Sequence, residues 1–299
     1  MGDEILVSVC CTAYNHEQYI RDALEGFVNQ ITDFKFEVII HDDASADHTA
    51  DIIREYETQY PDMIHAIYQQ ENQYSKGIWI TNTFIYPAVR GKYMAFCEGD
   101  DYWTDMHKLQ KQVDFLESHP EYSACVHNSI FLDCRTGKKR IRYQDKADTT
   151  LRLEDVLVGG GAQYQTSSLM QRRKYYKIPK ELECGGGVGD YPRSIYLAYV
   201  GKIYYFKECM STYRENVPGS WSLRNQGADK DISHYKAFLK MLNGADRMTK
   251  YEYKESIAEC KKKFRHRLAG AYVKAYFPAA YKAYRRIRDQ GRIREQHNI

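Results

Sequence analysis

The hydrophobic positions of residues 1–120 follow two alternating patterns. Continuous apolar runs predict buried strands at 5–12, 36–41, 64–68 and 92–97. Between them, apolar residues recur at helical spacing and predict helices at 17–30, from 47–49 onward, at 79–89 and at 108–118. Strands that alternate with helices are typical of a parallel α/β sheet. Because right-handed crossovers place the carboxyl ends of parallel strands at one edge, the segments that begin at Thr12, Asp42 and Glu98 should meet in one crevice.

The pattern changes after about residue 120. Runs at 122–132 and 139–143 predict a strand pair around a turn, and 163–172 and 202–214 are further β-rich runs. Glycine clusters at 159–161 and 185–187 suit loops over a ligand. From Ile232 the chain is predicted to be helical to its end, with a break at Pro278. We therefore predict a mixed α/β domain at 1–228, with halves at 1–120 and 121–228, and a helical extension at 229–299.

Composition excludes several classes of protein. Of the 299 residues, 43% are hydrophobic and 28% charged, which is ordinary for a globular chain. No apolar run approaches the roughly 20 residues that span a bilayer, and the acidic start does not resemble a secretory signal. The eight cysteines lack metal-site spacing, so we expect buried, reduced thiols in a cytoplasmic protein. A Rossmann dehydrogenase and a Walker-type phosphate loop are excluded because neither glycine motif is present.

The most informative local pattern is an acidic cluster directly after the fourth predicted strand. Residues 96–103 read FCEGDDYW and contain Glu98, Asp100 and Asp101. Neighbouring carboxylates repel one another, so a divalent cation bound together with a phosphate ligand would offset their charge. The alternative is that these acids solvate a turn or cap the next helix, although Thr104 is a better cap.

Two further strand ends carry groups that suit a nucleoside. Residues 41–47 read HDDASAD, and a carboxylate such as Asp43 can accept hydrogen bonds from a base imide or a ribose hydroxyl. At the end of the first strand, Thr12 and Tyr14 place a hydroxyl and an aromatic ring where they could flank a base or ribose. A capped turn and a simple turn are the respective alternative interpretations.

Four segments in series resemble the family 2 inverting glycosyltransferases, which use nucleotide sugars and have the GT-A fold. They are VSVCCTAYNHEQYI, FEVIIHDDASADHT, GKYMAFCEGDDYW and VGDYPRSIYLAYVGKIYYF, and the resemblance covers about residues 4 to 222. It implies that Thr12 and Tyr14 lie near the base and that Asp43 contacts a uracil-type imide. It also implies that Asp101 is the direct Mn²⁺ or Mg²⁺ ligand and that Asp100 lies near the ribose or metal-bound waters. The role of Glu98, which replaces the first acid of the family pattern, is left open.

The resemblance also implies a catalytic base and a phosphate ligand. Asp190 follows Gly189 at the start of a predicted helix and matches the family's general base, which must deprotonate the acceptor hydroxyl as it attacks the anomeric carbon. The alternative role for Asp190 is a helix cap. Arg214 would pair with diphosphate oxygens, and a structural arginine is the alternative.

Charge is distributed unevenly along the chain. Residues 261–299 contain twelve Lys or Arg and two acids, so this tail has a net charge of +10 and the rest of the chain one of −7. A basic helix that also contains tyrosines can lie on an anionic membrane surface. It can equally pack on the acidic body, and it lacks a recognised nucleic-acid module, so no nucleic-acid partner is expected.

Together these patterns predict a metal-dependent, inverting glycosyltransferase. Its partners would be a UDP-linked nucleotide-sugar donor and a glycan or lipid-linked acceptor in bacterial surface polysaccharide synthesis. It would be cytoplasmic, with peripheral contact to the inner face of the membrane through its tail. The alternatives are a nucleotidyltransferase and a non-catalytic glycan-binding or scaffold protein of the same fold.

Overall fold

The computed structural model describes residues 4–160, 163–183, 189–279 and 281. It divides into two compact units. The first comprises Met1–Ile178 and Gly189–Val217, and the second comprises Pro179–Val188 and Pro218–Ile299. The domain boundary predicted from the sequence, at 228 and 229, lies inside the second unit and stays a prediction.

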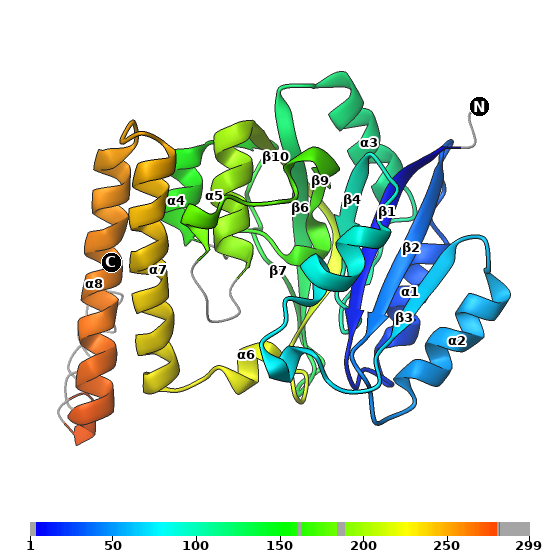
Figure 1. The fold of residues 1–299 in the computed structure, drawn as a ribbon, viewed down its shortest axis with the longest axis horizontal. Helices are drawn as coiled ribbons and strands as arrows, with labels where there is room; N and C mark the ends of the chain where they lie inside the picture. The colour runs from blue at the N-terminus through cyan, green and yellow to red at the C-terminus, as the bar shows by residue number, and fades with distance from the viewer. Residues whose placement is uncertain (1–3, 161–162, 184–188, 280, 282–299) are drawn as a thin grey trace. The chain divides into compact units, whose positions relative to one another are not determined.

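The first unit is built on one mixed sheet of ten described strands, drawn in Figure 1. Along it the order is β3-β2-β1-β4-β9-β6-β10-β5, with β7 added to β6 and β8 to β10. The strands are β1 (Ile5–Ala13), β2 (Lys35–Asp42), β3 (Ile64–Tyr68), β4 (Tyr93–Phe96), β5 (Tyr102–Trp103), β6 (Tyr122–Asp133), β7 (Lys139–Ile141), β8 (Thr149–Leu151), β9 (Met170–Arg172) and β10 (Lys202–Glu215). Strand β1 pairs in parallel with β2 and β4, and β2 pairs in parallel with β3. The α/β fold predicted from the sequence is confirmed.

Among its described residues the first unit has five α-helices: α1 (Ile20–Val28), α2 (Thr49–Gln59), α3 (Lys108–Ser118), α4 (Leu153–Gly159) and α5 (Asp190–Val200). The apolar face of α1 is fully buried through Ile20, Leu24 and Phe27, as its helical spacing predicts. This face packs into the same core as the apolar residues of β1, β2 and β4. The helices of residues 1–120 therefore stabilise the strands whose ends carry the predicted site residues.

Two predictions of local structure need correction. The helix expected at 79–89 is a π-helical turn at Thr81–Ile85 followed by a 3₁₀ turn at Tyr86–Ala88. Pro87, which has no backbone N–H and crowds the preceding turn, prevents a regular α-helix there. The strand expected at 163–172 is reduced to β9, preceded by a 3₁₀ turn at Thr166–Ser168. Further 3₁₀ turns occur at Tyr74–Lys76, Arg173–Tyr175 and Lys180–Leu182.

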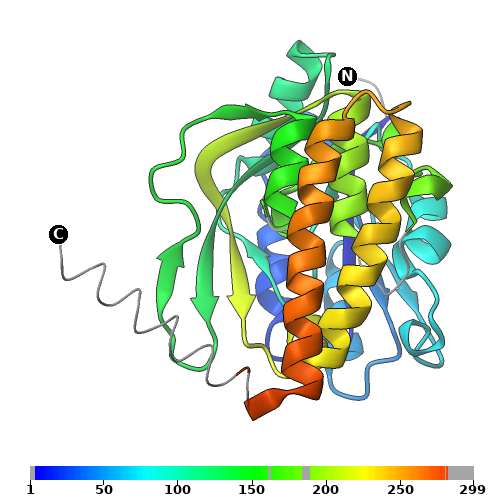
Figure 2. The same ribbon diagram turned by 90° about the vertical axis from the view of Figure 1, so that its left-hand side faces the viewer.

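The second unit is helical and contains α6 (Trp221–Arg224), α7 (Ala228–Met248) and α8 (Lys254–Tyr276). Helices α7 and α8 lie side by side in Figure 2. The predicted continuous helix is interrupted between them, where Lys250 and Tyr251 adopt positive φ angles of 50° and 63°. This break carries no proline or glycine and was missed for that reason. Residues 282–299, including much of the basic tail, lie outside the described residues.

The first testable prediction concerns the close approach of β4 to β1. A β-carbon on Gly91 would lie 2.6 Å from the backbone nitrogen of Ser8 and 2.7 Å from the carbonyl carbon of Val7. Because backbone atoms cannot move aside as a side chain can, Gly91→Ala should lower the free energy of unfolding by about 1–3 kcal/mol. Urea unfolding measures this change.

Gly270→Ala is the matched control. A β-carbon at this position in α8 would have no heavy atom within 4 Å. Since alanine favours a helix over glycine by roughly 0.5–1 kcal/mol, this variant should be unchanged or slightly more stable. Equal stabilities of the two variants would contradict the packing argument.

Candidate active site

The segments that follow β1, β2 and β4 are joined directly by backbone hydrogen bonds. The N–H of Asp43 donates to the carbonyl oxygen of Ala13 at 3.0 Å, and the N–H of Gly99 donates to that of Thr12 at 2.9 Å. The parallel strands thus bring their carboxyl ends to one edge, as the sequence predicts. Thr12, Asp43 and the acidic loop at 98–101 are neighbours.

The first two of these segments are further cross-linked by side chains. The N–H of Asn15 donates to Ser45 Oγ at 2.9 Å, and Asn15 Oδ1 accepts from the N–H of Ala46 at 2.8 Å. Asn15 and Ala44 both have positive φ angles, of 55° and 59°. Asn tolerates this conformation better than most residues, which helps to hold the loop in place. Tyr14, half-buried, lies in this cross-linked wall of the site.

Asp43 uses its carboxylate to position a third segment. Its two oxygens accept the backbone N–H groups of Gln73 and Tyr74 at 2.8 and 3.0 Å, and the residue is only 4% exposed. A carboxylate oxygen has two lone pairs, so these bonds leave acceptor capacity. The contact between Asp43 and a base stays a prediction, but the structure adds a role in holding the 72–76 segment.

Carboxylates are crowded in the loop after β4. Burial, and then the charges of Asp190 and Asp100, raise the pKa of Glu98 to about 8. Burial, followed by the charges of Asp100 and Glu98, raises the pKa of Asp101 well above its usual range. Oδ1 of Asp101 accepts the backbone N–H of Arg214 at 2.9 Å, and its carboxylate also accepts the Ser167 hydroxyl. The loop therefore concentrates acidic groups, and their ionisation develops negative charge that the protein only partly compensates.

This charge defines what the loop can bind. Carboxylate oxygens are the donors that Mg²⁺ and Mn²⁺ prefer, so the chemistry of Asp100 and Asp101 fits such an ion. Within the described parts of the chain, no three His, Cys, Asp or Glu side chains form a ready-made metal cluster. Asp101 as the direct ligand stays a prediction.

Asp190 begins α5 and lies close enough to Glu98 to interact with it electrostatically. The residue is exposed, yet protein atoms around its carboxylate displace water, and this desolvation raises its pKa, while the charge of Arg193 lowers it. A carboxylate whose pKa moves toward neutrality is a stronger base. The structure thus places the predicted base beside the acidic loop. Its neighbours Gly185–Gly187 lie outside the described residues.

Arg214 is already engaged by groups of the protein. Its guanidinium forms an ion pair with Asp22, and Nη1 donates to the carbonyl oxygen of Asp100 at 2.9 Å. The same group lies 4.4 Å from the ring centre of Tyr102 and 5.1 Å from that of Tyr19. Arg214 is 8% exposed. These contacts favour the structural interpretation, and its pairing with phosphate stays a prediction.

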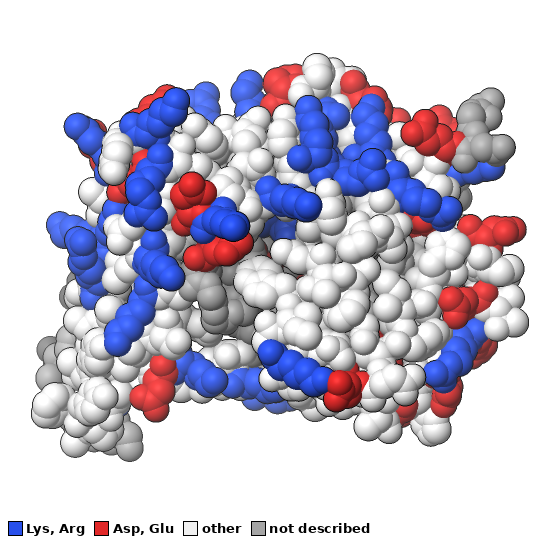
Figure 3. Space-filling view, viewed as in Figure 1, with Lys and Arg blue, Asp and Glu red and all other residues white. Residues whose placement is uncertain are grey.

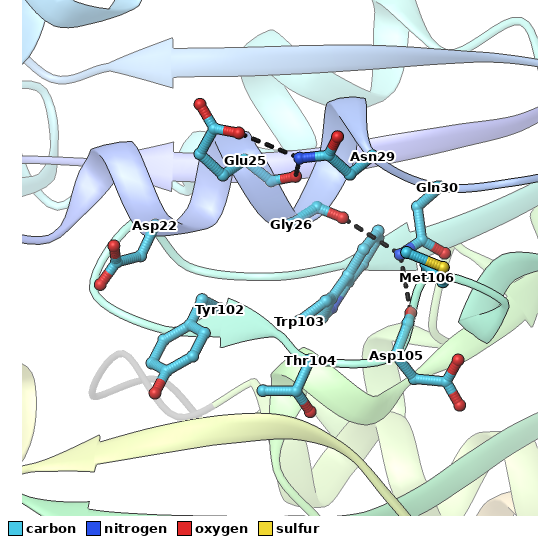
Figure 4. Close-up of a pocket in the computed structure, with 10 residues that line it drawn as sticks. All are labelled: Asp22, Glu25, Gly26, Asn29, Gln30, Tyr102, Trp103, Thr104, Asp105 and Met106. Atoms are coloured by element: carbon cyan, nitrogen blue, oxygen red, sulfur yellow. Dashed lines mark hydrogen bonds between the residues drawn. The ribbon is translucent and has the colours of Figure 1, made fainter.

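A cavity of about 460 Å³ lies between α1 and the segment around β5, shown in Figure 4. It is lined by Asp22, Glu25, Gly26, Asn29, Gln30, Tyr102, Trp103, Thr104, Asp105 and Met106. Several of its polar groups bond within the protein: Asn29 donates to Glu25, and Gln30 donates to the carbonyl oxygens of Gly26 and Asp105. None of the site residues predicted from the sequence lines this cavity.

A buried lysine that sequence patterns did not reveal lies against Trp103, two residues after the acidic loop. Lys108 is fully buried, its Nζ donates to Gln112 Oε1 at 2.7 Å, and this Nζ lies 4.1 Å from the ring centre of Trp103. Gln112 in turn donates to the carbonyl oxygen of Ser168 at 2.9 Å, and Trp103 donates to that of Ser167, also at 2.9 Å. A lone lysine at a helix start gives no signal of burial in the sequence.

A parallel α/β sheet with acids at the carboxyl ends of its strands, joined to a mixed second half, is the architecture of the GT-A glycosyltransferases. The chain belongs to glycosyl transferase family 2, whose model matches residues 8–178. The fold and family predicted from the sequence are confirmed.

Relatives of known sequence support this assignment. The chain is 37% identical over 219 residues to an uncharacterised protein of Mycobacterium tuberculosis, a match that covers 72% of this chain and 60% of that protein. It therefore spans less than two thirds of that relative. It is 34% identical over 207 residues to WfaP of Escherichia coli, named a UDP-Glc:alpha-D-GlcNAc-diphosphoundecaprenol beta-1,3-glucosyltransferase, covering 58% of this chain and 77% of WfaP.

A solved structure shows the same fold. The S. aureus protein TarS, crystallised with UDP-GlcNAc, superposes with a TM-score of 0.59 at 16% identity. The match covers 91% of this chain and 81% of that chain.

The second prediction follows from the burial of Lys108, which lowers its pKa to about 7. In the unfolded chain a lysine stays protonated up to about pH 10.4, so the unfolded state binds more protons between about pH 7 and 10. The contribution of Lys108 to stability should therefore rise with pH across this window. In urea unfolding, wild type should gain stability relative to Lys108→Met as the pH is raised from 7 to 10.

Lys139→Met, on exposed β7, provides the control. Its stability difference from wild type should change little over the same range of pH. A constant difference between wild type and Lys108→Met would show that the buried amine keeps its proton.

Proposed function

We propose that this chain transfers a sugar from UDP to a hydroxyl group of a glycan or glycolipid, with inversion at the anomeric carbon, in bacterial surface polysaccharide synthesis. The observation that carries the proposal is the position of Asp190 at the start of α5, within electrostatic range of the acidic loop after β4. A base and a charged leaving-group site that face one another are what an in-line displacement requires. The name of WfaP, which includes UDP-Glc, and the UDP-GlcNAc bound to TarS support UDP as the nucleotide.

The donor would lie along the ends of β1, β2 and β4. In this proposal Thr12, Tyr14 and Asp43 hold the base and ribose, and Asp100 lies near the ribose. Asp100 and Asp101 would hold Mn²⁺ or Mg²⁺, which supplies positive charge to the diphosphate as it departs. The raised pKa of Asp101 supports a cationic partner, since burial and its acidic neighbours disfavour its ionised form.

The acceptor would react on the side of Asp190. Its carboxylate takes the proton of the acceptor hydroxyl while that oxygen forms a bond to the anomeric carbon. The bond from this carbon to the diphosphate oxygen breaks on the opposite face, and its electron pair leaves with UDP. Attack opposite the leaving group inverts the anomeric configuration. Desolvation of Asp190 strengthens it for this task.

Two alternatives are less well supported. A nucleotidyltransferase would normally carry a glycine-rich, basic phosphate loop near the first strand, and residues 12–17 contain no such loop. A non-catalytic glycan-binding protein would not need Asp43, Asp101 and Asp190 together. Release of UDP from a nucleotide sugar in the presence of Mn²⁺ distinguishes an enzyme from such a protein.

A peripheral membrane contact is part of the proposal. Blue side chains gather in Figure 3 over the region where Figure 1 draws α7 and α8, and both helices contain several Lys and Arg residues. A lipid-linked acceptor, as in the name of WfaP, would make binding to an anionic surface useful.

None of the described helices is long and apolar enough to span a bilayer.

The third prediction tests the base. Asp190→Asn keeps the shape of the side chain but removes its ability to accept the hydroxyl proton. Sugar transfer, measured as UDP release with Mn²⁺ and a panel of nucleotide sugars and glycan acceptors, should fall about 10²–10⁴-fold. UDP affinity should stay within about twofold, because Asp190 faces the acceptor.

Asp62→Asn, in the exposed loop before β3, is the matched control and should leave transfer unchanged. Full turnover by Asp190→Asn would refute the assignment of the base.

The fourth prediction tests the cation. Mn²⁺ should strengthen the binding of UDP to wild type by at least about tenfold in calorimetric titration, because it offsets repulsion between diphosphate and acidic loop. Asp101→Asn should lose most of this gain while it still binds UDP weakly. Equal UDP affinity with and without Mn²⁺ in wild type would exclude a metal-dependent donor site.

A further inference from the structure

An exposed tryptophan lies next to the start of α5. Trp79 is 38% exposed, and a β-carbon built on Gly189 would lie 3.6 Å from Cζ3 of its indole ring. That distance is ordinary van der Waals contact, so the ring borders the residue that immediately precedes Asp190. No sequence motif marks Trp79, and nothing in the donor site described above uses it.

The segment that carries Trp79 is fixed at its beginning by hydrogen bonds to Asp43. Asp43 accepts the backbone N–H groups of Gln73 and Tyr74, and Asn72 donates its side-chain N–H to the carbonyl oxygen of Asp43 at 3.2 Å. Residues 72–74 are therefore held against Asp43, five residues before the chain reaches Trp79.

The same segment is fixed after Trp79 by Tyr176. The hydroxyl of Tyr176 donates to Asn82 Oδ1, and its ring stacks on that of Tyr86 at a centroid distance of 4.4 Å. The guanidinium of Arg193, in the first turn of α5, lies 4.6 Å from the ring centre of Tyr176. One tyrosine thus contacts both the Trp79 segment and the helix that begins with Asp190. The segment after Trp79 and the first turn of α5 are therefore both held by Tyr176.

An exposed indole next to the residue before Asp190 suits a sugar ring. Aromatic faces pack against the apolar C–H face of a pyranose, and a nearby polar group orients its hydroxyls. We propose that Trp79 is the stacking surface for the sugar of the acceptor that is attacked at the active site. This inference rests on the proposed function, because the base touches the acceptor hydroxyl and a ring next to it therefore meets the acceptor.

The experiment compares wild type with Trp79→Ala and Trp79→Phe. The donor is UDP-glucose, and the acceptor is α-GlcNAc diphosphate on a short soluble lipid. Trp79→Ala should raise the acceptor KM about tenfold, the loss of roughly one stacking contact, while Trp79→Phe stays within about threefold of wild type. UDP affinity should not change by more than about twofold in either variant.

Tyr199→Ala is the matched control. Tyr199 is an exposed aromatic residue near the carboxyl end of α5, the helix that begins with Asp190. It should leave the acceptor KM unchanged. Transfer by Trp79→Ala with the wild-type acceptor KM would refute the stacking role alone. A rise in the KM for UDP-glucose without one for the acceptor would also refute it, since the ring would then contact the donor.

A binding measurement separates this inference from the proposed function. Calorimetry measures the affinity of the acceptor for wild type and Trp79→Ala in the absence of donor. If wild type binds the acceptor through Trp79 but turns over no donor, Trp79 is a sugar-binding residue and the proposed transfer fails. If wild type neither binds nor uses this acceptor or any of the panel of glycan acceptors, the outcome overturns both.

Discussion

Repulsion among crowded carboxylates is the constraint on which the site depends. Glu98, Asp100 and Asp101 follow one strand, and Asp190 approaches them from α5. A protein gathers like charges in this way only at a cost in stability, which a bound cation or a proton can offset. The fold keeps the carboxylates together through the edge where the parallel strands end. Asp101 accordingly accepts hydrogen bonds from two neutral donors, the N–H of Arg214 and the hydroxyl of Ser167.

Much of the fold follows from local patterns. Apolar periodicity predicts the four strands of residues 1–120, the helix α5 and the long strand β10, because it indicates which face of an element is buried. Features that depend on single dihedral angles were not predicted. The break after α7 uses positive φ angles at Lys250 and Tyr251, residues that usually avoid them. The two-residue strand β5 exists because it pairs with β10, far away in the sequence.

The candidate site also contains residues that the sequence predicts and residues that it does not. The acids after β2 and β4 were singled out from their places at strand ends, because topology brings such positions together, whereas Asp190 was assigned through the resemblance to family 2. Lys108, Trp79 and Arg193 were missed, since their importance lies in contacts with residues remote in sequence. Arg193 alone offered a signal, three residues after Asp190 on the same helix. Arg214 contacts Asp22 and two tyrosines, and these contacts likewise depend on how α1 and β5 meet β10.

The hydrogen bond that holds Asp101 comes from the main chain of residue 214, not from its side chain. Every amino acid except proline supplies this N–H, and the pairing of β10 with β6 fixes its direction. A different side chain at position 214 would lose the ion pair with Asp22 and the bond to the carbonyl oxygen of Asp100, but it would keep the main-chain bond to Asp101. The backbone of β10 thus orients Asp101 whatever residue occupies position 214, whereas the backbone of its neighbour Asp100 depends on the arginine.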